Sequence, residues 1–192
     1  MNVYYLRTDA NKYRGVIITQ GDWRPFCDLF DGTPVSGPWT DVTIGWDPDM
    51  RRKPKGDFPS LLTHIPVFTS KAADVLSDLL EGSGELLPIM VDGEEYFLYN
   101  VTRVIDALDE SRSEIIRFDD FEIMDIDVHC FFPEKIGDAA VFKIPQMVTS
   151  DVFVTDVFVD RVKSARLKGF KFPLLWSSEY KVQHEPGSSL FR

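Results

Sequence analysis

Two amphipathic helical segments constrain the fold of this chain more than any other feature of its sequence. From Ser70 to Gly82, apolar residues recur at spacings of three and four, which predicts a helix that ends at the glycine. A second pattern of this kind runs from Thr155 to Gly169. Each helix has one apolar face that must be buried, so other elements must cover it.

Strand-like segments occupy most of the remaining sequence. They are short, rich in β-branched and aromatic residues, and bounded by Gly, Asp or Pro, at positions 3–6, 15–19, 41–46, 95–99, 114–118, 121–126 and 140–144. Residues 100–109 fit either a helix or a strand followed by an Asp-rich turn. Runs of strands broken by two helices predict the α+β class, with a largely antiparallel sheet and two main amphipathic helices.

The length of 192 residues fits a single domain over 1–192. Within it we expect a loop-rich strand region at 1–60, where Pro and Gly are frequent, and a tail at 184–192. The two helices have similar surroundings, because VFTS at 67–70 and VFVT at 152–155 each precede one. A duplicated strand-helix-strand unit and chance similarity both remain open.

The charge of the chain is unevenly distributed. The net charge is −10 and the pI is about 4.7, which argues against a nucleic-acid partner. Residues 61–130 contain four basic and sixteen acidic residues, a net charge of −12. Such a field attracts a basic partner, or it is a solvated face that keeps the protein soluble.

No membrane partner is expected, because the longest apolar stretches are far shorter than the roughly 18 residues that span a bilayer. The chain starts without a basic segment before an apolar core, so no secretory signal is predicted. Cys27 and Cys130 are far apart in sequence and form no C-x-x-C motif. Two free thiols in a reducing cytoplasm fit best.

The sequence carries no catalytic signature. Phosphate-binding, dinucleotide-binding, nucleophile-elbow and zinc-protease motifs are all missing, and the three histidines are not at metal-ligand spacing. We therefore expect no cofactor and no metal. An unfamiliar site for a small ligand or a reaction, built on His129, Asp125 and Asp127, is a rival hypothesis.

Several segments, in their order, resemble the eleventh immunity-protein family of bacterial polymorphic-toxin systems. They are IPVFTSKAADVL at 65–76, GELLP at 84–88, YFLYNV at 96–101, DALDESRS at 106–113, VFVTDVF at 152–158 and LKGFKF at 167–172. The resemblance covers about 61–175. It implies a small, cytoplasmic, non-enzymatic protein that binds and neutralises a cognate toxin, and it carries over no catalytic residues.

The charge count, together with that resemblance, predicts steric and electrostatic occlusion of a toxin surface. The electrostatic part applies where that surface is basic. The candidate partner-binding residues are acidic groups of the middle third and two aromatic residues of the loop-rich region: Asp106, Asp109, Glu110, Asp119, Asp120, Trp39 and Trp46. A ligand-binding or assembly protein is the alternative, and both a monomer and a homodimer are compatible with the sequence.

Overall fold

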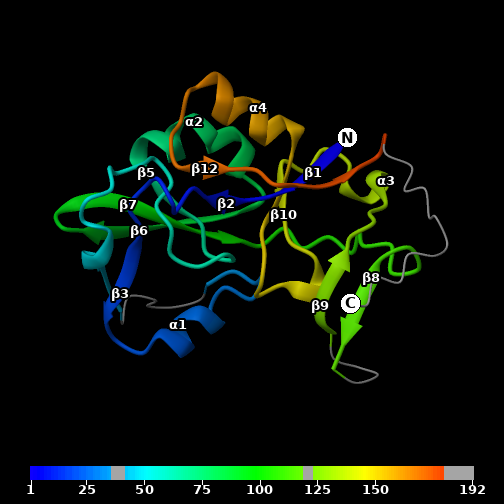
Figure 1. Cartoon of the computed structure of the whole chain (residues 1–192), viewed down its shortest axis with the longest axis horizontal. Helices are drawn as coiled ribbons and strands as arrows, with labels where there is room; N and C mark the ends of the chain where they lie inside the picture. The colour runs from blue at the N-terminus through cyan, green and yellow to red at the C-terminus, as the bar shows by residue number, and fades with distance from the viewer. Residues whose placement is uncertain (36–41, 119–122, 180–192) are drawn as a thin grey trace, which may run out of the picture.

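A computed structural model describes residues 1–35, 42–118 and 123–179 (Figure 1). The two longer helices are α2 (Ser70–Leu80) and α4 (Asp156–Ser164), and two short ones are α1 (Trp23–Asp28) and α3 (Pro133–Ile136). Two 3₁₀ turns, η1 (Pro48–Met50) and η2 (Pro145–Met147), complete the helical elements of the described residues. The α+β class and the two main helices are confirmed. Helix α4 ends earlier than predicted, because Arg166 takes a left-handed conformation, with φ of 54°.

The paired strands are all antiparallel, as predicted, but they form separate sheets. A four-stranded sheet has the order β10 (Val141–Phe142), β11 (Phe153–Thr155), β1 (Asn2–Tyr5) and β13 (Leu174–Ser177). A three-stranded sheet has the order β5 (Val67–Thr69), β7 (Glu94–Val101) and β6 (Gly84–Val91). Three two-stranded ladders pair β12 (Phe170–Lys171) with β2 (Arg7–Thr8), β3 (Val16–Gln20) with β4 (Thr43–Trp46), and β8 (Glu114–Arg117) with β9 (Ile123–Val128).

The two larger sheets repeat one topology. In the first, β5 leads through α2 to β6, and both strands pair with the central β7. In the second, β11 leads through α4 and the short β12 to β13, and both β11 and β13 pair with the central β1. In the first unit the central strand β7 follows β6 directly through a tight turn. In the second unit the central strand β1 precedes the other strands by more than 140 residues. The similarity around the two helices is therefore also a similarity of topology.

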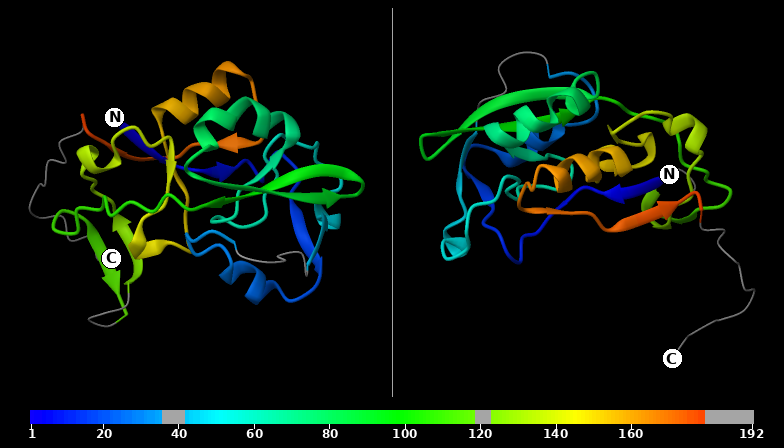
Figure 2. Two further views of the ribbon diagram at one scale, coloured as in Figure 1. Left: turned by 180° about the vertical axis from the view of Figure 1, so that it is seen from behind. Right: turned by 90° about the horizontal axis from the view of Figure 1, so that it is seen from above.

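Helices α2 and α4 lie side by side on one side of the molecule (Figure 2). Their apolar faces share one core cluster, in which Leu76 of α2 and Phe158 of α4 are fully buried. Thr69 caps α2 by accepting a hydrogen bond from the Ala72 N–H at 3.2 Å. Arg161 of α4 donates to both carboxylate oxygens of Asp78, at 2.5 and 2.8 Å. The basic helix thus contacts the acidic third of the same chain.

Two further clusters complete the core. One lies between the β3–β4 ladder, α1 and the three-stranded sheet, and the other surrounds the four-stranded sheet and the base of β9. Lys143, next to β10, is fully buried, and its Nζ donates to the carbonyl of Phe30 at 2.7 Å. Burial lowers the pKa of Lys143 to about 8, although Asp31 opposes this effect. The segment after α1 is thereby attached to the core.

Candidate functional site

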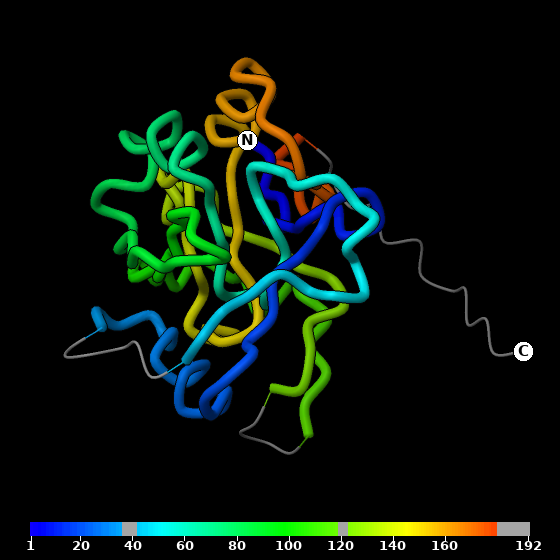
Figure 3. Tube along the Cα trace, turned by 90° about the vertical axis from the view of Figure 1, so that its left-hand side faces the viewer, coloured from blue at the N-terminus to red at the C-terminus, as the bar shows by residue number. Residues whose placement is uncertain are grey.

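The β8–β9 hairpin extends from the body of the molecule (Figures 1 and 3). Its strands pair Ile115 with Ile126 and Ile116 with Asp125. Ile126 is buried and Ile115 packs against the same core cluster, so these side chains anchor the ribbon. Because side chains alternate along a strand, the opposite positions face solvent.

The exposed positions of the hairpin combine acidic and apolar side chains. Glu114, Asp125 and Asp127 are exposed. Three large apolar residues are exposed as well: Phe118 by 75%, Met124 by 57% and Ile116 by 39%. Exposed apolar groups beside charged ones are a common composition for a protein-binding surface, since the apolar groups supply affinity and the charges supply orientation.

At the base of the hairpin, two of the predicted acidic residues come together. Asp106 and Glu110 both accept a hydrogen bond from the Nε2 of Gln146, each at 3.1 Å. Glu110 also forms an ion pair with Arg117 of β8 at 3.0 Å, and Asp106 lies 3.8 Å from the Nζ of Lys135. Both carboxylates remain largely exposed, so they are accessible, but part of their charge is balanced within the chain.

Asp109, in contrast, is buried and holds the turn that leads into β8. Its carboxylate accepts hydrogen bonds from the Ser111 hydroxyl at 2.6 Å and the Arg112 Nε at 2.5 Å. Its backbone N–H donates to the carbonyl of Cys130 at 2.8 Å. These bonds, first that of Ser111 and then that of Arg112, lower the pKa of the Asp109 carboxyl group. This placement gives Asp109 a structural role and leaves its carboxylate little access to a partner.

Trp46 is placed inside the molecule, where its ring packs edge-on against Tyr96 and is only 6% exposed. The cationic groups of Arg14 and Lys55 lie 5.2 and 5.0 Å from the ring centre. Among the tryptophans of the described residues, Trp23 is the exposed one, with 56% of its surface accessible. Trp39, Asp119 and Asp120 fall outside the described residues.

The rival site around His129 is not assembled as a reactive cluster. The ring is buried against Tyr5, Phe131 and Phe153, and burial lowers its pKa. Among the described residues, no hydrogen bond joins His129 to Asp125 or Asp127. Within the same part of the chain, no three His, Cys, Asp or Glu side chains form a group that can hold a metal ion.

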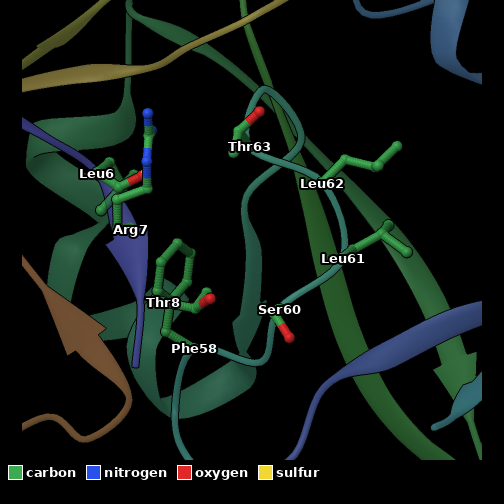
Figure 4. A pocket seen from close by; sticks show the side chains of 8 residues that line it. All are labelled: Leu6, Arg7, Thr8, Phe58, Ser60, Leu61, Leu62 and Thr63. Carbon is green, nitrogen blue, oxygen red and sulfur yellow. The ribbon is translucent and has the colours of Figure 1, made fainter. Parts of the chain in front are cut away.

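A pocket of about 100 Å³ lies between β2 and the segment 58–63 (Figure 4). Binding sites for small ligands usually enclose roughly 300–1,000 Å³, so this pocket has little room. Its one charged lining group, Arg7, is already used. The guanidinium donates to Asp151 at 2.5 Å and lies 4.3 Å from the centre of the Tyr5 ring.

Sequence reasoning missed the partners of the acidic residues. Gln146, Arg117 and Lys135 come from different segments, and only the folded chain brings them to Asp106 and Glu110. The Asp-rich turn was a signal for the role of Asp109, because short acidic side chains commonly bond to nearby backbone amides.

Comparison with known proteins gives one family. The model of the Imm11 immunity protein family matches residues 89–174, and this confirms the predicted resemblance. The matched region contains the β8–β9 hairpin and its base, whereas the similar segments at 65–88 lie before it. A search of curated proteins found no match. In the described residues, no helix is long and apolar enough to cross a membrane.

Proposed function

We propose a specific mode of toxin neutralisation for this protein. Residues 89–174 match a family of immunity proteins, and this match indicates an immunity function against a toxin protein and favours a non-enzymatic role. The protein inserts its β8–β9 hairpin, together with Asp106 and Glu110 at the base, into a basic functional surface of the toxin. The toxin is thereby blocked sterically and electrostatically. No chemical step is needed.

The observation that carries this proposal is the composition of the projecting hairpin. Phe118 and Met124 are among the most exposed apolar side chains of the described residues. Met124 lies in β9 and Phe118 directly follows β8, in the ribbon that extends from the body (Figure 3). Buried in an interface, such side chains act as anchors that slow dissociation. The neighbouring acids, Glu114, Asp125 and Asp127, speed the encounter with a basic surface.

The charge of this region supports a basic partner. Residues 106–128 contain nine acidic and two basic residues, a net charge of −7. The field of these groups extends about 8 Å into a solution of physiological ionic strength. Basic groups of the toxin would also compete with Arg117 for Glu110. We expect the encounter in the cytoplasm, since Cys27 and Cys130 are free and buried.

The test is co-expression with the candidate toxin, combined with affinity measured at low and high salt. The variant Glu114→Lys/Asp125→Lys/Asp127→Lys should lose protection and bind at least about 100-fold more weakly at low salt, since each tenfold loss needs only about 1.4 kcal/mol. A second variant, Phe118→Ser/Met124→Ser, should mainly accelerate dissociation.

The matched control changes the net charge equally at exposed acids of the helix layer: Asp74→Lys/Glu81→Lys/Asp160→Lys. We expect it to protect cells as the natural chain does. If the hairpin variants protected cells fully, or if the control lost as much affinity as they did, the hairpin would not be the binding surface.

A further inference from the structure

Strand β3 pairs with β4 along one edge, and in the described part of the chain no strand pairs with its other, open edge. On the paired side, the Gly15 carbonyl accepts from Asp47 of the β4 side at 3.0 Å, whereas the Val16 N–H points the other way and donates to Ser60 at 2.8 Å. In an antiparallel ladder this alternation continues, so Ile18 also directs its N–H and C=O away from β4. Outside the β3–β4 ladder, no backbone hydrogen bond of Ile18 is found among the described residues.

The open edge lacks two of the features that protect edge strands, charged residues and proline, although the register shifts between Ile18 and Gln20. β3 reads VIITQ, without a charge or a proline. The nearest charged residues in sequence are Arg14 and Asp22, outside the strand. An unprotected edge of this kind is a template for pairing with another extended segment.

An apolar groove of about 320 Å³ runs beside this edge. It is lined by one side of β3, by the residues that follow it, and by the segment after Ser60: Val16, Ile17, Ile18, Thr19, Gly21, Trp23, Leu61 and Leu62. Trp23 is 56% exposed and Leu62 is 39% exposed, so both can contact a ligand. Leu61 and Leu62 also line the smaller pocket, and Figure 4 shows their side chains on the side away from Leu6 and Arg7.

The size and charge of the groove define what fits it. Eight residues line it, while a stable interface between folded proteins uses about 20–30 residues a side, so a second folded copy would need far more surface. The unpaired groups of Ile18 require an extended backbone. None of the eight lining residues carries a charge, so the groove favours an uncharged segment.

We propose that this groove binds a short, extended, uncharged segment of a partner protein by strand addition to β3, with an aliphatic or aromatic side chain packed on Trp23. The site lies outside the family-matched region and on a different side of the molecule from the β8–β9 hairpin (Figures 1 and 2). It does not depend on the proposed toxin-binding surface.

The test pans a phage library of random linear dodecapeptides on the full chain and measures the affinity of the selected peptides. Enriched sequences should be uncharged and rich in β-branched or aromatic residues. Leu62→Lys and Trp23→Ala should each weaken binding by about tenfold or more. Val157→Lys is the matched control, since Val157 is a 55% exposed apolar residue on α4, and it should leave the affinity unchanged.

Three tests examine the backbone pairing itself. The Ile18 amide should exchange more slowly with deuterium when peptide is bound, while the Ile17 amide, already directed at β4, should not change. Methylation of the peptide nitrogen that pairs with Ile18 should abolish binding. Ile18→Pro should weaken binding without breaking the β3–β4 ladder, since proline is tolerated where the N–H faces outward.

The proposal fails if no sequence is enriched, if the enriched sequences are charged, or if Leu62→Lys binds them unchanged. It also fails if methylated peptides bind equally well, because the groove would then hold only side chains. Charge reversal of the hairpin should not affect peptide binding, so a failure here is distinct from a failure of toxin neutralisation.

Discussion

Replacement of the buried Lys143 by methionine should stabilise the protein. Lys143 is fully buried, and in the described residues its Nζ has one hydrogen-bond acceptor, the Phe30 carbonyl at 2.7 Å, and no ion pair within 4.0 Å. Methionine has a side chain of similar length without a charge. The Lys143→Met variant therefore keeps most of the packing and removes the charge that burial disfavours.

The magnitude follows from the pKa of Lys143, which burial lowers from 10.5 to about 8. That difference corresponds to about 3 kcal/mol against the charged form. At pH 7 the amine is still charged, so the folded protein bears this cost. Loss of the hydrogen bond to Phe30 offsets about 1 kcal/mol. We expect Lys143→Met to raise the free energy of unfolding by about 1–2 kcal/mol at pH 7.

The pH dependence gives a second signature. Between about pH 8 and 10.5 the unfolded chain retains the Lys143 proton that the folded chain has released, so Lys143 should make the stability of the natural protein rise with pH relative to that of the variant. The variant should lack this rise. Urea unfolding at pH 7, 8, 9 and 10, followed by tryptophan fluorescence, measures both effects.

The control is Lys163→Met, because Lys163 is exposed on α4 and its replacement should change neither quantity. If Lys143→Met kept the full rise with pH, another group would be responsible for it. If the variant were less stable than the natural protein by more than about 1 kcal/mol at pH 7, the amine would stabilise the fold and the reasoning would be refuted.

Three further changes test local features. Thr69→Ala removes the cap of α2 and should lower the free energy of unfolding by about 1 kcal/mol in urea titrations, whereas Thr69→Ser should not. Gly169→Ala should lower the melting temperature through a loss of about 1–3 kcal/mol, since φ is 93° and the new Cβ would lie 3.0 Å from the Phe58 carbonyl oxygen. Asp109→Ala should accelerate deuterium exchange in the turn before β8 while the rest of the chain stays protected; uniform exchange would contradict its local role.

The elements of this fold could be predicted from the sequence because their signals are local. Helical periodicity identified α2 and α4, and β-branched runs identified β1, β3 and β8. The division into separate sheets could not be predicted, since it depends on which distant strands pair. Helix α1 was missed because its six residues are too short for a periodic pattern and include Pro25.

The candidate site could be predicted only as a charged region. The count of acidic residues located the negative charge in the middle third of the chain. It could not distinguish the exposed Asp106 from the buried Asp109, because both are aspartates and they lie only three residues apart. The same holds for Trp46, whose place in the core is set by Tyr96 of another sheet. Exposure depends on tertiary contacts, and a local pattern does not contain them.

The position of β1 in the second sheet has a consequence for synthesis of the protein. Val3 pairs with Thr155 on one side and with Trp176 on the other, so β1 needs partners that are translated more than 150 residues later. At a translation rate of about 5–20 residues per second, β1 waits on the order of 10–30 s for them. The four-stranded sheet therefore closes after translation of its last strand, and a chain stalled on the ribosome cannot complete it.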